Sequence, residues 1–173
     1  MKIYLDMDGV LSDLDGALAL FGGVDLSTVQ KDAILRNRLI RERVSKLGLE
    51  HWESLEPLNK EQWEKDLRSI SWGEVEILTS FGTWNPLEIG PLSHQGKCNW
   101  LKTHYGNFFD EGIISGFNGV EKCEHKELFS GLNTCLIDDA QENCSRFSRR
   151  LGVAFLYTQE NHSEVISKIN GMK

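Results

Sequence analysis

Two aspartates near the start of the chain have a spacing that suits catalysis at a metal ion. Asp6 and Asp8 follow a short apolar run at residues 2–5, and Gly9 comes directly after them. Carboxylates at i and i+2 beyond a strand can both reach one hard divalent cation, and oxygen ligands suit Mg²⁺. Such a cation reduces the repulsion between a phosphate and Asp6, which frees that carboxylate to act as a nucleophile. Asp8 is then placed to protonate the leaving oxygen and later to deprotonate water.

Two further pairs of polar residues end apolar runs later in the chain. Thr79 and Ser80 close one run, and their hydroxyls can donate hydrogen bonds to phosphoryl oxygens. Asp138 and Asp139 close another, and either of them can complete the metal shell with Asp6. Each pair alone is equally typical of a helix cap or a solvated turn. Their order on one chain favours a single site for phosphate transfer.

Two lysines are candidates for balancing the charge of a phosphoryl group during transfer. Lys97 opens a helical stretch at residues 97–105, and Lys126 lies upstream of the apolar run that ends at Asp138. The residue types alone leave both candidates open.

The elements that must position these residues alternate along the sequence. Apolar runs predict strands at residues 2–5, 75–78, 113–114, 134–137 and 153–157, and helical stretches lie at 97–105 and 143–151, the second closed by Gly152 as a C-cap. Strands that alternate with helices predict an α/β fold with a doubly wound parallel sheet. Open parallel sheets bind ligands at the carboxyl ends of their strands, where the polar residues above would converge.

A helical segment at residues 14–70 interrupts this alternation. Its apolar residues recur with helical periodicity, which predicts a small helical cap inserted after the first strand, with 1–13 and 71–173 forming the core. A charged stretch within it contains Arg36, Arg38, Arg41, Glu42 and Arg43. This stretch is either a solvated helix face or part of a mobile cap whose arginines meet the substrate phosphate or its leaving group.

The composition limits the classes of partner. The 173 residues carry a formal net charge of −7, which argues against stable binding to duplex nucleic acid, because such proteins cluster Lys and Arg. No apolar run reaches the length of about 18 residues that spans a membrane, no signal-peptide pattern is present, and none of the four cysteines lies in a C-x-x-C pair. We therefore expect a cytoplasmic protein, bacterial or phage-encoded, that does not bind membranes. A homodimer is compatible with the sequence, and the five scattered histidines are expected at the surface.

With its four motifs in this order, the chain resembles the haloacid dehalogenase (HAD) superfamily of phosphohydrolases over residues 1 to 157. The resemblance implies that Asp6 is the nucleophile and Asp8 the acid/base. It also implies that Asp138, alone or with Asp139, holds Mg²⁺ together with Asp6 and the Asp8 carbonyl group. Thr79 and Ser80 would bind phosphate. The same resemblance favours Lys97 over Lys126 as the lysine that stabilises the phosphoryl group.

Within the superfamily, the chain is most similar to the 5′(3′)-deoxyribonucleotidases. The passages that carry this similarity are residues 6–13, 52–58, 97–100 followed by Tyr105-Gly106, and 136–139. The similarity implies hydrolysis of (deoxy)nucleoside monophosphates through an aspartyl-phosphate, with Trp52 stacked on the base. Trp52 would alternatively pin the cap against the core, and Phe81 would edge the substrate pocket. The competing functions are a HAD phosphatase for another small metabolite or a nucleic-acid end, and a non-catalytic phosphate-binding module.

Overall fold

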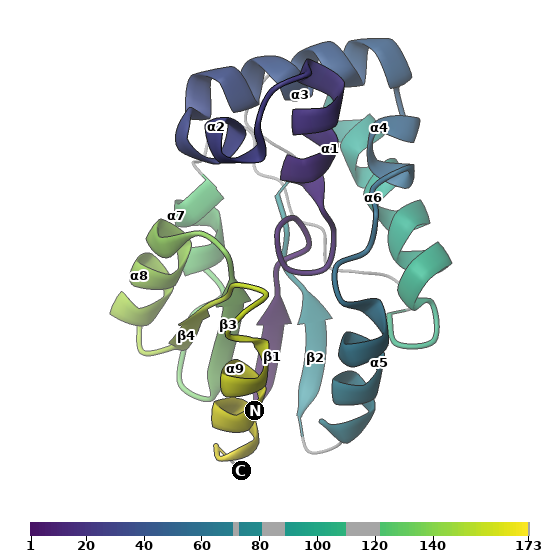
Figure 1. The fold of residues 1–173 in the computed structure, drawn as a ribbon. Helices are drawn as coiled ribbons and strands as arrows, with labels where there is room; N and C mark the ends of the chain where they lie inside the picture. Colours follow the sequence, from purple (N-terminus) through teal and green to yellow (C-terminus); the bar gives the residue numbers. More distant parts are fainter. Residues whose placement is uncertain (71–72, 81–88, 110–121, 173) are drawn as a thin grey trace.

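A parallel β-sheet forms the centre of the structure, a computed structural model that describes residues 1–70, 73–80, 89–109 and 122–172 (Figure 1). Its described strands are β1 (Lys2–Leu5), β2 (Glu74–Ile77), β3 (Thr134–Asp138) and β4 (Val153–Leu156), in the order β2-β1-β3-β4. All pairings between these strands are parallel. The α/β class predicted from the alternation is confirmed, and the predicted strand at 113–114 lies outside the described residues.

Helices cover both faces of the sheet, because successive strand residues point to opposite sides. Ile3 and Leu5 belong to a large apolar cluster shared with the helices α5 (Lys60–Ser69), α6 (Ile89–Tyr105) and α9 (His162–Asn170). Tyr4 points the other way, into a smaller cluster with Phe147 of α8 (Gln141–Arg149). The short α7 (Lys122–Glu127) packs against α8 on that face. The sheet is therefore buried on both sides, as a parallel sheet requires.

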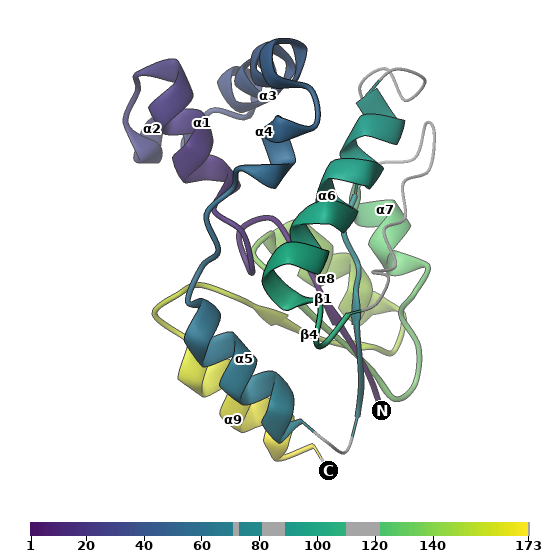
Figure 2. The same cartoon turned by 90° about the vertical axis from the view of Figure 1, so that its right-hand side faces the viewer.

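Four helices stand over the carboxyl ends of the strands, and we call them the helical lobe (residues 14–53; Figures 1 and 2). They are α1 (Leu14–Gly22), α2 (Leu26–Lys31), α3 (Ala33–Leu47) and α4 (Glu50–Glu53). Asp13 caps α1 by accepting a hydrogen bond from the Gly16 amide at 2.8 Å. Asp32 likewise caps α3, where its carboxylate accepts from two amides of the first turn.

The helix α5 lies apart from the lobe, although the sequence suggested a cap that continues to residue 70. Figure 2 shows α5 beside α9 at the opposite end of the molecule. The Trp63 ring is fully buried and lies 4.6 Å from the His162 ring, while His162 Nε2 is 2.7 Å from Asp66 Oδ2. Helical periodicity predicts that a helix exists but not which surface it covers. Here the apolar side of α5 is matched by α9, so α5 packs with the core.

The end of α8 also differs from the expected glycine cap. The helix ends at Arg149, and Leu151, rather than Gly152, has a positive φ of 73°. A Cβ added to Gly152 would lie 2.3 Å from the Phe147 ring and 2.6 Å from Ser130 Oγ. Glycine is thus required at 152 by close packing rather than by its backbone angles.

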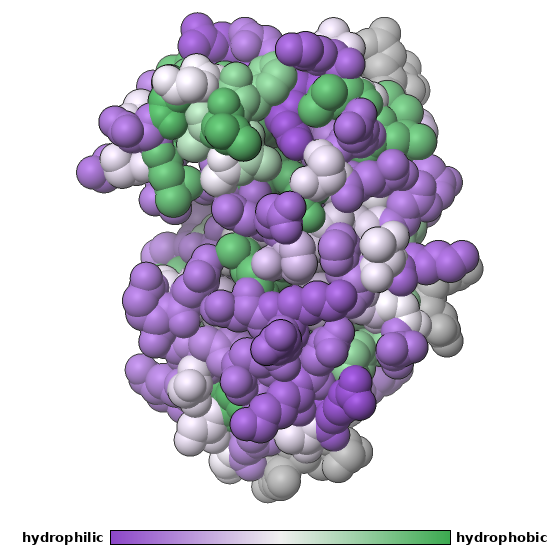
Figure 3. Space-filling view, turned by 45° about the vertical axis from the view of Figure 1, so that its right-hand side comes forward, coloured by the Kyte–Doolittle hydropathy of each residue, from purple (hydrophilic) through white to green (hydrophobic). Residues whose placement is uncertain are grey.

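Polar side chains cover most of the face in Figure 3, whereas apolar ones gather over the helical lobe. The outline of the molecule is narrower between the helical lobe and the part that contains the sheet (Figure 3). Leu20 and Ile34, both in the lobe, are 87% and 84% exposed. Within the described ranges, no helix is both long enough and apolar enough to cross a bilayer.

Candidate active site

The loop that follows β1 brings the first two aspartates to the carboxyl end of the sheet. Met7 is its anchor, because the Met7 carbonyl accepts hydrogen bonds from the amides of Leu11 and Ser12 at 2.8 and 2.9 Å. Gly9 turns the chain with a φ of +83°, a region that favours glycine. A Cβ at this position would also lie 2.1 Å from Asp139 Oδ2. A side chain at residue 9 would therefore require the Asp139 carboxylate to move.

Three carboxylates gather where β1 and β3 end. Asp6, Asp138 and Asp139 each offer one oxygen, and these oxygens lie within 4.8 Å of one another. Asp6 and Asp138 are fully buried. The Lys126 ammonium contacts both, at 2.9 Å from Asp6 Oδ1 and in a short contact with Asp138 Oδ2. One lysine leaves two formal negative charges on the three carboxylates, so the oxygen donors fit a divalent cation in number and in charge.

Asp138 is held in place by its own helix. Its Oδ1 accepts hydrogen bonds from the Ala140 amide at 2.9 Å and from Asn143 Nδ2 at 2.8 Å, while Oδ2 faces Lys126. Asn143 was not among the residues predicted from the sequence. Its position five residues after Asp138, in the first turn of α8, is the signal that could have identified it.

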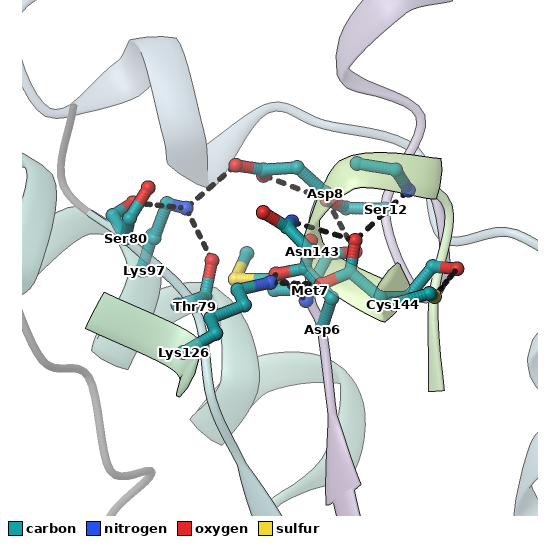
Figure 4. Close-up of polar contacts among 12 residues, drawn as sticks. Asp6, Met7, Asp8, Ser12, Thr79, Ser80, Lys97, Lys126, Asn143 and Cys144 are labelled. Carbon is teal, nitrogen blue, oxygen red and sulfur yellow. Dashed lines mark hydrogen bonds and ion pairs between the residues drawn. The ribbon is translucent and has the colours of Figure 1, made fainter. Parts of the chain in front are cut away.

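Asp8 lies in a second group, separate from the three carboxylates. Its Oδ2 is 2.6 Å from the Lys97 ammonium, which also donates to Thr79 Oγ1 at 2.8 Å and to the Ser80 carbonyl oxygen at 3.0 Å (Figure 4). Ser12 Oγ donates to Asp8 Oδ1 at 3.3 Å, a contact the sequence analysis did not include. The expectation that the side chains of Asp6 and Asp8 share one cation stays a prediction, and in this arrangement the Asp8 carboxylate contacts Lys97.

Both lysine candidates reach the site, each on its own side. Lys97 is 1% exposed and lies between Asp8 and Thr79, whereas Lys126 is fully buried against Asp6 and Asp138. The sequence suggested that only one of the two lysines, Lys97, would act at the site, but in the structure both lysines contact its carboxylates. The structure places Lys126 beside the predicted nucleophile and Lys97 beside the predicted acid/base.

The aromatic residues expected to contact a substrate do not lie in the described part of the site. Trp52 is only 3% exposed, and a Cβ added to Gly96 of α6 would lie 3.0 Å from its Cβ. This tryptophan packs α4 against α6 and presents no open face on which a base could stack. Phe81 lies outside the described residues.

Three of the arginines of the helical lobe have different environments. Arg38 is exposed and 3.8 Å from Glu42, as expected for a solvated helix face. Arg43 is buried and donates to the ring and carbonyl group of His51 and to Ser54 Oγ. Arg36 instead forms an ion pair with Asp15 of α1 at 2.6 Å.

His51 is buried rather than at the surface, and its tautomer follows from its neighbour. Arg43 Nη1 lies 3.0 Å from His51 Nδ1, and a guanidinium only donates, so Nδ1 is the acceptor and Nε2 carries the proton. Burial, and after it the charge of Arg43, lowers the pKa of His51 to about 3. The ring therefore stays neutral in the folded protein at pH values where a free histidine is protonated.

This histidine predicts a loss of stability on acidification. The pKa of His51 is about 3 in the folded chain and 6.5 in the unfolded chain. Below pH 6.5, therefore, the imidazole is protonated in the unfolded state but stays neutral in the folded state. At pH 5 this should reduce the free energy of unfolding by about 2 kcal/mol relative to pH 8. We expect His51→Asn, which keeps an acceptor for Arg43, to be less sensitive to pH. Urea unfolding of both proteins between pH 8 and 5 is the measurement, and equal slopes would contradict the assignment.

Comparison with known proteins bears on the fold. No protein-family model matches the chain, and a search of curated proteins finds no similar sequence. Among solved structures, a similar one is described as a predicted HAD-like family hydrolase from Porphyromonas gingivalis. It matches with a TM-score of 0.56 and 14% identity over 98% of this chain and 97% of that chain. An identity this low supports the fold alone. The chain therefore shares the α/β fold of that protein. In this chain the acidic cluster lies at the carboxyl end of the parallel sheet.

Proposed function

We propose that the protein is a Mg²⁺-dependent phosphomonoesterase that forms an aspartyl-phosphate on Asp6, with (deoxy)nucleoside monophosphates as the preferred substrates. One observation carries the proposal: Asp6 and Asp8, two residues apart, lie in different electrostatic environments. Asp6 lies with Lys126 and two further carboxylates, while Asp8 contacts Lys97 and Ser12. Two carboxylates with different partners can take the separate roles of nucleophile and acid/base.

The three-carboxylate cluster of Asp6, Asp138 and Asp139 would hold the cation. When bound, Mg²⁺ supplies positive charge that offsets the repulsion between a phosphate and Asp6. Lys126 would add charge on the same side, because it contacts Asp6 and Asp138. Asn143 and the Ala140 amide keep Asp138 in the orientation that this role needs.

In the first step, an oxygen of Asp6 forms a bond to phosphorus while the bond to the leaving oxygen breaks. That oxygen needs a proton, and Asp8 would donate it. Paired with Lys97, Asp8 is a carboxylate that can only accept protons. A phosphate that draws the Lys97 ammonium and the Thr79 hydroxyl to itself would release Asp8, which would take up one proton from solvent as the substrate binds.

In the second step, Asp8 takes a proton from water as the water oxygen attacks phosphorus and the bond to Asp6 breaks. Inorganic phosphate leaves, and Asp6 is regenerated as a carboxylate. Asp8 thus regains the proton that it gave to the leaving group, and it returns this proton to solvent when phosphate leaves and Lys97 pairs with it again. The two steps use one group first as acid and then as base.

The test is a panel of phosphomonoesters assayed for release of inorganic phosphate with Mg²⁺ or with EDTA. The panel contains p-nitrophenyl phosphate, deoxynucleoside 5′- and 3′-monophosphates, ribonucleotides, sugar phosphates and a 5′-phosphorylated oligonucleotide. We expect turnover that EDTA abolishes, with the highest kcat/KM on deoxynucleotides. Preference for sugar phosphates would retain the chemistry and change the substrate class. No release from any compound with Mg²⁺ present would overturn the proposal.

The close packing at Gly9 gives a prediction for the loop. In Gly9→Ala the added Cβ would displace the Asp139 carboxylate, from which it would be only 2.1 Å away, and the backbone would be strained at a φ of +83°. A misplacement on the order of 1 Å is expected to reduce kcat/KM about 100-fold. Phosphate release from p-nitrophenyl phosphate measures the effect.

Gly131→Ala is the matched control for this loop variant. A Cβ at Gly131 meets no atom within 4 Å, so its activity should match that of the wild type. Equal activity of the two variants would contradict the packing argument.

A further inference from the structure

An ion pair at the base of the helical lobe lies outside the catalytic groups described above. Asp15 stands in the first turn of α1, seven residues after Asp8. Arg36, in the first turn of α3, donates from Nε to Asp15 Oδ1 at 2.6 Å. The pair joins the two helices at the point where the chain leaves the catalytic loop.

The side chains of this ion pair are partly exposed, so a ligand can contact them. The side chains of Arg36 and Asp15 are 29% and 22% exposed, unlike the buried Arg43 of the same helix. Among the described residues, no group hydrogen-bonds to the terminal nitrogens of Arg36 or to the second carboxylate oxygen of Asp15. The pair therefore presents both donors and an acceptor.

The pair also lies within electrostatic reach of the catalytic acids. Burial lowers the pKa of Arg36, but the charges of Asp15, Asp8 and Asp139 raise it above its usual value. In Figure 1, α1 rises from the loop after β1 and α3 crosses above it. A leaving group attached to a phosphate between Asp6 and Asp8 would extend toward this part of the lobe.

The net charge of the site and of the Arg36–Asp15 pair determines which leaving groups can bind there. The four aspartates at 6, 8, 138 and 139 are opposed by two lysines, so a divalent cation makes the set formally neutral. A bound phosphate then adds negative charge, and the Arg36–Asp15 pair contributes none overall. A second phosphate on the leaving group would meet no excess positive charge among the described groups and would lie near the Asp15 carboxylate.

We propose that the Arg36–Asp15 pair recognises the leaving group and selects phosphomonoesters whose leaving group is uncharged and carries hydroxyl or amide groups, as a nucleoside does. The inference rests on the proposed phosphatase function and names its specificity element. Arg36 donates to oxygens of the leaving group, and Asp15 accepts from its hydroxyl or amide groups. Asp15 also neutralises Arg36, which makes the site reject a second anionic group.

The test compares a deoxynucleoside 5′-monophosphate with its 3′,5′-bisphosphate by kcat/KM in the presence of Mg²⁺. The wild type should prefer the monophosphate. Asp15→Asn leaves the charge of Arg36 unopposed and should shift the ratio toward the bisphosphate about tenfold, the size expected for one charge at a partly exposed site. Arg36→Gln leaves Asp15 unopposed and should shift the ratio the other way.

Two controls separate recognition from structure. The double variant Asp15→Asn/Arg36→Gln is neutral again and should return the ratio to near the wild-type value. Arg38→Gln removes an exposed arginine paired with Glu42 on the same helix and should leave the ratio unchanged. Thermal melting of each variant checks that it is folded, and Arg36→Met, which also removes the positive charge, replaces Arg36→Gln if the latter unfolds.

The outcomes distinguish this inference from the proposed function. If the wild type fails to hydrolyse p-nitrophenyl phosphate, the phosphatase proposal itself fails. If the wild type hydrolyses it and the monophosphate, but the ratio of the two nucleotides is the same in all folded variants, only the role of the pair is overturned. Opposite shifts in the two single variants support the role.

Discussion

Asp6→Asn should reduce kcat for phosphate release by about 10⁴-fold or more, because an amide cannot form the phosphoryl bond. The Asp6 carboxylate is fully buried and accepts a hydrogen bond from the Met7 amide at 2.8 Å, so its oxygen is held in one orientation. Asparagine preserves the shape and that acceptor, so the loop should keep its form. Colorimetric phosphate release with p-nitrophenyl phosphate and Mg²⁺ measures the loss.

A covalent intermediate gives this variant a second readout. Wild-type protein incubated with substrate and quenched in acid should gain the mass of one phosphoryl group on the peptide that contains Asp6, and Asp6→Asn should not. Asp25→Asn is the matched control, because Asp25 is exposed at the start of α2 and its side chain makes no cap hydrogen bond. Wild-type activity in Asp6→Asn would eliminate the covalent mechanism, whatever the substrate.

Lys126→Met should cost both stability and activity. Its ammonium is fully buried against two fully buried carboxylates, Asp6 and Asp138. Removing one partner of a buried ion pair leaves uncompensated charge and costs about 3–5 kcal/mol. Without Mg²⁺, the melting temperature of the variant should fall well below that of the wild type.

The effect of Mg²⁺ on the melting temperature of Lys126→Met tests whether the acidic cluster binds a cation. The variant keeps the three carboxylates at 6, 138 and 139 with one fewer positive charge. Added Mg²⁺ should therefore raise the melting temperature of Lys126→Met more than that of the wild type, while kcat stays low. Lys168→Met, which removes an exposed lysine paired with Glu164, should behave as the wild type in both assays. An equal Mg²⁺ response in Lys126→Met and wild type would contradict a cation site at this cluster.

Local pattern was sufficient to predict the fold class. Apolar runs that alternate with helices predicted the parallel sheet, and the described strands lie within a residue of their predicted positions. The polar residues that end these strands come together for the same reason, since parallel strands end at one edge of the sheet. Their positions in the sequence were thus enough to predict Asp6, Thr79 and Asp138 as neighbours, although their catalytic roles remain predictions.

Contacts between distant segments could not be predicted from that pattern. Nothing local to Lys126 or Lys97 shows that one meets Asp6 and the other Asp8, because helix packing brings them there. Periodicity also does not distinguish a tryptophan that faces a ligand from one that packs α4 against α6, and Trp52 does the latter.

The sequence by itself determined the sheet, the order of its motifs and the edge where they meet, because these follow from neighbouring residues along the chain. Only the tertiary structure decided which side chains pair across that edge. In that structure Asp8 contacts Lys97 rather than the acidic cluster, α5 packs with the core, and Arg36 forms an ion pair with Asp15. Each of these depends on how helices far apart in sequence pack together, and the relative positions of two packed surfaces leave no periodic signal in either one.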